Sequence, residues 1–297
     1  MTAVVGEQTR DVEIATRPSR WQRLRESLAP LLSSKVALAG LSIVLFWVFI
    51  AIFAPVISPY GPLTQDYTAV NEGPSAKHLL GTDDLGRDLL ARLIHGARLI
   101  LVLAPISVLC ALVVGTTLGL SAGYFGGMVD EVVMRILDGM MAFPAILLYL
   151  VILFAVGASA INVVIAITIA GAPGIARLVR SLTLDIRTRE YIAAAEMRGE
   201  NPFYTMFVEI LPNASGPIIV DAMLRVGYAV FAIGTLGFLG LGLPPPAPDW
   251  GSMVARGRMF IWTNPWTVLW PSLAISSLVV GLNLFADGLR EEVTRYQ

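Results

Sequence analysis

The stretch Glu190-Tyr-Ile-Ala-Ala-Ala-Glu-Met-Arg-Gly-Glu-Asn-Pro-Phe-Tyr-Thr-Met-Phe-Val-Glu-Ile-Leu-Pro-Asn213 is a charged connector between long apolar segments. Its part 193–198 consists of strong helix formers, and Gly199 suits the left-handed conformation that ends many helices. Asn201 and Pro202 provide an N-cap and a first helical residue for a second helix, which Pro212 is expected to close. The pattern predicts two short helices joined at Gly199, a shape suited to docking on another molecule.

The composition places the chain in a membrane. Of its 297 residues, 56% are hydrophobic and only 14% are charged, with a mean hydropathy of +0.71, whereas about a quarter of a soluble domain is charged. The net charge of −1 provides no basic surface for nucleic acid. The single cysteine, Cys110, cannot form an intramolecular disulfide and is expected to be a small buried apolar residue. His78 and His95 do not supply the four ligands of a structural zinc site, so no metal site is expected.

Six apolar segments are long enough to cross a bilayer, which takes about 20 residues of helix. They lie at about 36–57, 98–122, 131–156 (with Pro144 inside), 159–180, 216–243 and 267–288. The first segment follows basic residues, as a signal peptide does, but its length and the later spans indicate an uncleaved transmembrane helix. We therefore predict an all-α membrane protein with six transmembrane helices. Residues 1–35 and 293–297 would be its tails and 36–292 its membrane domain.

The basic residues predict the orientation, because they gather on the cytoplasmic side of a membrane. The segment 58–97 carries more acidic than basic side chains, so it and 244–266 are expected to be external. Both termini and the loop 185–215 are expected to be cytoplasmic. The basic residues used are Arg10, Arg17, Arg20, Arg23, Arg25 and Lys35 before the first span, Arg177, Arg180, Arg187, Arg189 and Arg198 after the fourth, and Arg290 and Arg295 after the sixth.

The connector resembles the EAA loop of ATP-binding-cassette (ABC) importer permeases, whose signature is Glu-Ala-Ala, three residues, Gly, nine residues and Ile-x-Leu-Pro. Ala193 replaces the leading Glu, and Glu209 stands where Ile is expected. The resemblance implies that this loop couples the chain to an ATPase, whereas the residues alone leave a generic amphipathic loop open. The coupling residues that it implies are Ala194, Ala195, Glu196, Gly199, Asn201, Pro202, Leu211 and Pro212.

A second motif lies in the predicted external loop and reads His78-Leu-Leu-Gly-Thr-Asp-Asp-Leu-Gly-Arg-Asp88. Thr82 or Asp83 is expected to cap a helix that begins near Asp84, and Arg87 to bridge neighbouring carboxylates. By itself the stretch predicts an ordered structural cap. It resembles the H-x-L-G-T-D-x-x-G-R-D segment of one permease subunit of dipeptide, oligopeptide and nickel importers. The resemblance implies docking of a substrate-binding protein at Gly81, Thr82, Asp83, Gly86, Arg87 and Asp88.

Other polar residues allow a structural interpretation as well as a functional one. Asp221 and Arg225 are spaced i, i+4 at the start of the fifth span, so they line the inner end of a path or form a self-satisfied pair. Asp249 is expected to cap a short interfacial helix, with substrate contact as the alternative. Glu131, Arg135 and Asp138 share one helix face and are expected to pair with one another. Trp250, Trp262 and Trp266 are expected at the membrane interface.

The sequence carries no phosphate-binding Gly-x-x-x-x-Gly-Lys-Ser/Thr loop and no catalytic triad. The chain is therefore not expected to be an enzyme and has no candidate catalytic residue. If transport is driven by ATP, then ATP and Mg²⁺ are bound by partner subunits.

Over about 36–292 the chain resembles the C-type permease of dipeptide, oligopeptide and nickel importers. The resemblance implies the type I ABC importer permease fold in a prokaryotic plasma (inner) membrane. It also implies three kinds of partner: a second homologous permease subunit, one or two ATP-binding subunits and an extracytoplasmic substrate-binding protein. The expected solutes are di- and oligopeptides, while nickel, haem and other small solutes stay open. A secondary transporter or channel would show midplane charges, broken helices or inverted repeats. A non-transporting membrane scaffold is a further alternative.

Overall fold

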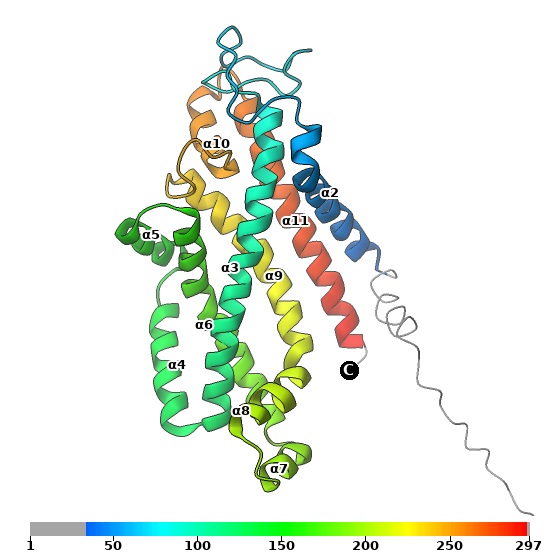
Figure 1. Ribbon diagram of the computed structural model, residues 1–297, viewed down its shortest axis with the longest axis vertical. Coiled ribbons are helices and arrows are strands. Elements are labelled where there is room, and N and C mark those ends of the chain that lie inside the picture. Colours follow the sequence, from blue (N-terminus) through cyan, green and yellow to red (C-terminus); the bar gives the residue numbers. More distant parts are fainter. Residues whose placement is uncertain (1–33, 296–297) are drawn as a thin grey trace, which may run out of the picture.

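The computed structural model describes residues 34–295, and within them it is built from helices, with no strand longer than an isolated bridge (Figure 1). The predicted basic tail up to residue 33, and residues 296–297, lie outside the described residues. Five helices in the described part are long and apolar enough to cross a membrane. They are α2 (Lys35–Ile57), α3 (Leu89–Phe125), α6 (Ala160–Ile186), the run Pro202–Phe238 that ends in α9 (Leu211–Phe238), and α11 (Trp266–Arg295). The all-α class of the prediction is confirmed.

The long helices begin at side-chain caps. Ser34 accepts a hydrogen bond from the Ala37 amide (3.2 Å), Asp88 from the Ala91 amide (2.7 Å) and Ser159 from the Asn162 amide (3.2 Å). Each cap satisfies one of the amides that the first helical turn leaves unpaired. The helix starts are therefore encoded locally, and the apolar runs that follow provide the length.

The most extensive contact between two helices is that of α3 with α6, and it depends on glycines spaced four residues apart. A β-carbon at Gly115 would lie 2.7 Å from the Ala172 carbonyl oxygen, and one at Gly119 would lie 2.5 Å from the Ala176 carbonyl oxygen. Small residues at this spacing let two backbones approach, which is the usual way to gain packing energy between helices in lipid. The pair α3–α6 forms the centre of the bundle.

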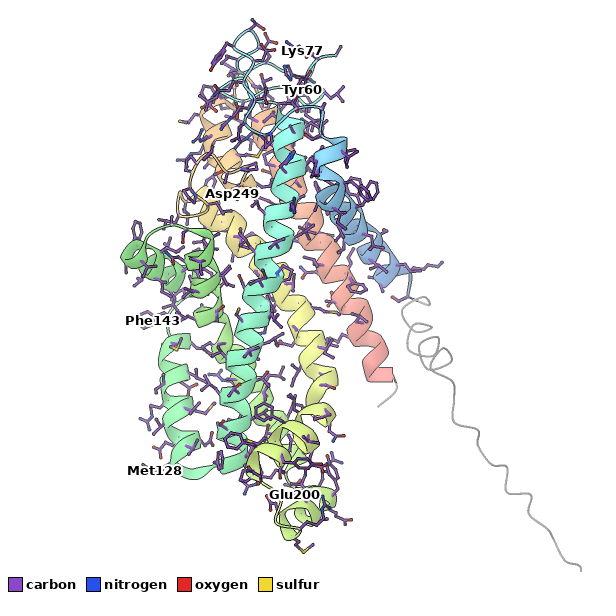
Figure 2. The ribbon with its side chains drawn as sticks, in the orientation of Figure 1. Tyr60, Lys77, Met128, Phe143, Glu200 and Asp249 are labelled. Atoms are coloured by element: carbon purple, nitrogen blue, oxygen red, sulfur yellow. The ribbon has the colours of Figure 1, made fainter. Side chains whose placement is uncertain are left out.

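The third predicted span is not one helix. It consists of α4 (Gly127–Met141) and α5 (Ala145–Val156), which meet at an angle of 90°. Pro144 lies at the break and has an extended backbone (ψ 130°). α4 ends before it because proline has no amide to continue the helical hydrogen bonds and disfavours helical geometry at the preceding residue, Phe143. Figure 2 labels Phe143 at this bend. The predicted third span is therefore bent at the proline that the prediction placed inside it, and the described residues hold five apolar spans, or six if this bent pair is counted as one.

The second span begins earlier than predicted. Helix α3 starts at Leu89 rather than near residue 98, so the polar loop ends at Asp88. Neither Thr82 nor Asp83 caps a helix, because Asp83 closes a tight turn by accepting hydrogen bonds from the Leu85 and Arg87 amides (both 2.9 Å). Residues 58–88 fold into a compact layer over one end of the bundle, which we call the cap (Figure 1).

At the opposite end lie α7 (Glu190–Met197), α8 (Pro202–Tyr204) and the π-helical segment η1 (Thr205–Ile210). We call residues 190–210 the elbow. Pro212 does not close the second helix: η1 continues directly into α9. Pro212 lies in the first turn of α9, where a missing amide is tolerated, and the wider π turn precedes it.

The fifth span ends at Phe238 instead of about residue 243. The connection to α11 contains α10 (Trp250–Gly257) and η2 (Arg258–Phe260). Trp250 is fully buried and its indole donates a 2.9 Å hydrogen bond to the Leu93 carbonyl, so its placement at a membrane interface was wrong. Trp262, in contrast, is exposed. Cys110 lies on an uncovered face of α3 and is exposed, contrary to the prediction of burial.

Candidate functional site

The elbow is anchored on one side only. Ile192 and Ala195 of α7 are fully buried, and Ile192 packs with Met206 and Ile210 in a cluster that reaches α3 and α6. The opposite side of the elbow carries apolar side chains in the open, among them Met197 (83% exposed). Burying one face of such a short helix places it firmly on α6 and α9, while its outer face stays available to a partner. Of the predicted coupling residues, Ala194 and Leu211 are half-buried, Ala195 is buried, and Glu196, Gly199, Asn201, Pro202 and Pro212 are exposed.

The turn of the elbow has the geometry that the sequence predicts. Gly199 adopts a φ of +77°, its amide bonds to the Glu196 carbonyl (3.0 Å), and the Glu200 amide bonds to the Ala195 carbonyl (3.3 Å). This is the Schellman arrangement that ends a helix at glycine. Asn201 then caps the next helix by accepting from the Phe203 amide at 2.9 Å. These local predictions are confirmed, and the role of the elbow in coupling stays a prediction.

Charged groups surround the elbow turn without being buried. Arg198 lies 3.4 Å from a Glu200 carboxylate oxygen and 3.9 Å from that of Glu209. Phe203, Tyr204 and Phe207 are exposed beside them, and Figure 2 shows Glu200 at this tip of the molecule. A surface that mixes exposed aromatic rings with a solvent-accessible arginine has the composition of a protein interface.

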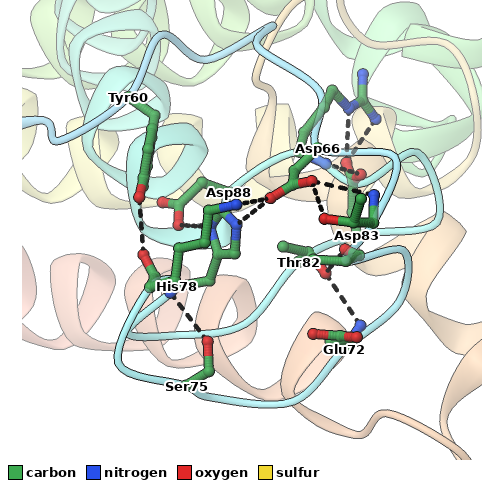
Figure 3. Close-up of polar contacts among 12 residues, drawn as sticks. Tyr60, Asp66, Glu72, Ser75, His78, Thr82, Asp83 and Asp88 are labelled. Carbon is green, nitrogen blue, oxygen red and sulfur yellow. Dashed lines mark hydrogen bonds and ion pairs between the residues drawn. The ribbon is translucent and has the colours of Figure 1, made fainter.

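The cap, in contrast, binds its own polar groups (Figure 3). Asp83 accepts a 2.7 Å hydrogen bond from the Arg87 guanidinium, so the predicted Arg87 bridge is confirmed for this carboxylate. Asp88 caps α3 and also accepts from His78 Nδ1 at 2.9 Å. Thr82 Oγ1 donates to the Ala69 carbonyl (2.6 Å) and accepts from the Glu72 amide (3.0 Å). The polar side chains of this network are buried, and each has a hydrogen-bond partner, as a stable polar network requires. They belong to His78, Thr82, Asp83, Arg87 and Asp88.

Two glycines make this folding of the cap possible. Gly81 (φ +90°) and Gly86 (φ +70°) adopt left-handed conformations, and a β-carbon on Gly86 would lie 2.2 Å from the Asp66 carbonyl oxygen. On the rim, Lys77 forms an ion pair with Asp66. The hydrogen bonds from Lys77 and then from Thr68 hold the pKa of the Asp66 carboxyl well below its usual value, and Asp66 raises the pKa of Lys77.

The cap is also tied to the segment before α11. The Asn264 side-chain amide donates to the carbonyl oxygens of Glu72 (3.0 Å) and Thr82 (3.2 Å).

Asp249 caps α10 by accepting from the amides of Gly251 (3.2 Å) and Ser252 (3.1 Å), as predicted. Burial raises the pKa of the Asp249 carboxyl to about 6.

Asp221 and Arg225 form the predicted pair one turn apart, well inside α9 rather than at its end. Arg225 also donates to the Gly171 carbonyl of α6 at 3.3 Å. The pair therefore joins α9 to α6, and each partner finds its counter-charge on the same helix. A place for this pair along a transport path stays a prediction.

Sequence reasoning missed two ion pairs between helices. Arg180 of α6 holds both carboxylate oxygens of Asp130 on α4, and Arg177 donates to Asp138 at 2.6 Å. The predicted cluster on α4 is therefore only partly correct: Arg135 pairs with Glu131 (3.3 Å), and Asp138 turns to α6. The only signal in the sequence was that α4 carries acidic residues and α6 basic ones, since the spacings of the paired residues on the two helices do not match. Among the described residues, no group of His, Cys, Asp and Glu is arranged to hold a metal ion.

Comparison with known proteins identifies the family. Residues 115–295 match the family described as binding-protein-dependent transport system inner membrane component, and residues 19–74 match the N-terminal transmembrane domain of oligopeptide transport permease C. The chain is 44% identical to a dipeptide transport system permease protein of Alkalihalophilus pseudofirmus, over 93% of this chain and 90% of that one. It is 42% identical to a di/tripeptide transport system permease protein of Pseudomonas aeruginosa, over 90% of each chain.

Among solved structures, a chain of the MetNI methionine ABC transporter in an inward-facing conformation superimposes with a TM-score of 0.55. The match covers 70% of this chain and 98% of that chain at 19% identity, so it shows the fold alone. The fold is that of type I ABC importer permeases, as the resemblance implied. This chain belongs to the family of inner membrane components of binding-protein-dependent transport systems.

Proposed function

We propose that this chain is one permease subunit of an ATP-driven importer of dipeptides or short oligopeptides. The observation that carries the proposal is the elbow, which is packed on the spans through one face and open on the other. A force applied to its outer face passes to α6 and α9 through Ile192, Met206 and Ile210. A two-state membrane path can be biased in this way by a partner that changes shape with nucleotide.

The orientation follows from charge and is part of the proposal. Arg177 and Arg180 lie in the last three turns of α6, Arg187 and Arg189 in the short connection to α7, and Arg198 in the elbow. The elbow end therefore faces the cytoplasm by the positive-inside tendency. The cap and α10 then face the outside. In these terms the external segments are 58–88 and 239–265, and the ATPase-facing segment is 187–210. Both termini are proposed to be cytoplasmic in a prokaryotic inner membrane.

The partners are proposed from the family and from the uncovered surfaces. A second, homologous permease would cover part of the apolar surface that this chain leaves exposed, for example Val102, Leu109 and Val113 on α3. Two ATP-binding subunits would dock at the elbows of the two permeases. A substrate-binding protein would deliver solute at the cap. The peptide solute is proposed from the dipeptide permeases that this chain resembles over nearly its whole length.

The test is reconstitution of the chain with a second permease, the ATPases and the binding protein in liposomes. Binding protein loaded with dipeptide is expected to stimulate ATP hydrolysis and to produce ATP-dependent uptake. Nickel complexes and haem serve as alternative solutes in the same assay, and stimulation by one of them but not by peptides would replace the peptide assignment. Uptake driven by an ion gradient without ATP would indicate a secondary transporter and overturn the proposal.

A further inference from the structure

A pocket of about 180 Å³ opens beside the cap, between the end of α9, the loop 240–247 and α10. Three guanidinium groups contribute to its wall: Arg87 and Arg92 from the cap side and Arg256 from α10. The other lining residues are small or apolar, apart from Ser252, and none of those described is acidic. Figure 2 shows Asp249 close to this region of the molecule. A hollow that three arginines share is unusual for a polar surface, because like charges repel at short range.

The three arginines differ in how far their hydrogen-bonding capacity is used. Arg87 is engaged by Asp83. Arg92 is 3% exposed and its terminal nitrogens donate to the carbonyls of Pro62 (3.2 Å) and Ala247 (3.4 Å). Its Nε has no hydrogen-bond partner and lies 3.6 Å from an Asp83 oxygen. Half-buried Arg256 has no hydrogen bond or ion pair within the described residues.

The carboxylates nearby are already occupied. Asp83 accepts from the Arg87 side chain and from two backbone amides. Asp249 uses both oxygens to cap α10. Asp84 is half-exposed and borders a smaller neighbouring cavity rather than this pocket. A buried donor on Arg92 and an unpaired charge on Arg256 therefore both border this pocket, and leaving both unmatched costs free energy.

We propose that this pocket binds the free carboxylate of the transported solute, an inference that rests on the proposed function. A carboxylate offers two acceptor oxygens to guanidinium donors and forms the strongest neutralising pair with arginine. The volume corresponds to roughly six water molecules at about 30 Å³ each, enough for a terminal carboxylate and its first carbons. Because the three guanidinium groups border the pocket and its other lining residues are small or apolar apart from Ser252, the pocket recognises the carboxylate end of the solute.

The test combines two substitutions with two solutes in the reconstituted transporter. Arg256→Gln removes the unpaired charge, and Arg258→Gln is the matched control, since Arg258 is exposed, lies two residues further on and stacks over Phe238 at 5.3 Å. The solutes are dialanine and dialanine amide, which lacks the carboxylate. Arg256→Gln is expected to raise the KM for dialanine by about tenfold or more, as for the loss of a charged hydrogen bond, and to leave uptake of the amide unchanged. Arg258→Gln is expected to change neither.

Because the same binding protein is present throughout, an effect that depends on the solute carboxylate belongs to the permease. An equal loss for both solutes in Arg256→Gln would assign the pocket to a contact with the binding protein and overturn the inference, as would no loss for either. Absence of peptide uptake by the wild type would overturn the proposed function instead. A second experiment measures the binding of N-acetylalanine to the purified chain by calorimetric titration. Saturable binding that Arg256→Gln abolishes supports a carboxylate pocket, and its absence in the wild type overturns it.

Discussion

The cap and the elbow are both polar connectors between spans, but the charged side chains of the cap are mostly buried and paired, whereas those of the elbow are mostly exposed. The cap buries Arg87 (5% exposed), Asp88 and His78 and pairs each with a partner inside the same chain. The elbow leaves Glu196, Arg198 and Phe203 exposed and buries only Ile192, Ala195 and the inner residues of η1. A buried polar network stabilises one structure only if it is complete, whereas an exposed mixed surface contributes little until a partner covers it. The cap is therefore built for stability and the elbow for contact.

The largest expected effect is on the cap. Arg87→Ala removes the partner of Asp83 in a buried site, and breaking a buried ion pair costs about 3–5 kcal/mol. We expect a large fall in the thermal unfolding midpoint of the purified chain in detergent and a poor yield. The matched substitution in the elbow, Arg198→Ala, removes an exposed arginine worth about 0–1 kcal/mol, so its midpoint should stay near that of the wild type. Equal midpoints for the two variants would contradict the contrast between cap and elbow.

The next effect is a pH dependence at Asp249. Because burial raises the pKa of this carboxyl to about 6, above its value in the unfolded chain, the protonated form favours folding. The free energy of unfolding is therefore highest below about pH 4, and it falls as the pH rises through about 6. The total fall attributable to this carboxyl is about 2–3 kcal/mol between these two extremes of pH. Asp249→Asn keeps a capping oxygen without the charge.

We therefore expect the gain in unfolding midpoint of Asp249→Asn over the wild type to be larger at pH 7.5 than at pH 5. Glu196→Gln in the exposed elbow is the control and should show no such difference between the two pH values. A constant offset for Asp249→Asn at both pH values would argue against a buried, partly protonated carboxyl.

A smaller cost in stability but a larger one in function is expected at Gly199. A β-carbon in the left-handed region costs roughly 1–2 kcal/mol, and no other atom lies within 4 Å of its position, so the strain is purely one of the backbone. Gly199→Val should still insert into the membrane but should lose co-purification with the ATPase or stimulation of its activity by substrate.

Gly157→Val is the matched control, because Gly157 has a φ of +87° and equally open surroundings, but lies between α5 and α6. It should carry the same strain and retain the ATPase. Normal substrate-stimulated ATP hydrolysis by Gly199→Val would remove the argument for the elbow as the coupling element.

The smallest effect is expected at Lys77, which lies on the rim of the cap with a solvent-exposed side chain. Surface ion pairs contribute little, so Lys77→Cys should leave the unfolding midpoint unchanged. In a Cys110→Ser background, which removes the exposed native thiol, this cysteine should react with an impermeant thiol reagent added outside the cell. Reaction only from the cytoplasmic side would reverse the proposed orientation of both cap and elbow.

Much of the site follows from short-range sequence. The left-handed turn at Gly199, the cap by Asn201 and the pairing of Asp83 with Arg87 each involve residues at most five positions apart. Local backbone preferences and nearest neighbours decide such features, so they could be predicted without knowledge of the fold. The predictions for Thr82, Asp83 and Pro212 were wrong because each local sequence is compatible with two structures. Pro212 could end one helix or lie in the first turn of the next. Asp83 could start a helix or close a turn, and the Gly86–Asp66 contact, distant in sequence, selects the turn.

What the sequence determined by itself was the membrane class and the approximate spans, because apolar length is a local property and the bilayer responds to it directly. Only the tertiary structure decided which residues distant in the sequence meet. The burial of Trp250 against Leu93, the pairing of Arg180 with Asp130 and the convergence of Arg92 with Arg256 on one pocket each join residues far apart in the chain. The sequence spacing of such residues carries no information about their distance in space, since that distance depends on how the glycine-lined helices α3 and α6 and the connections at both ends pack together.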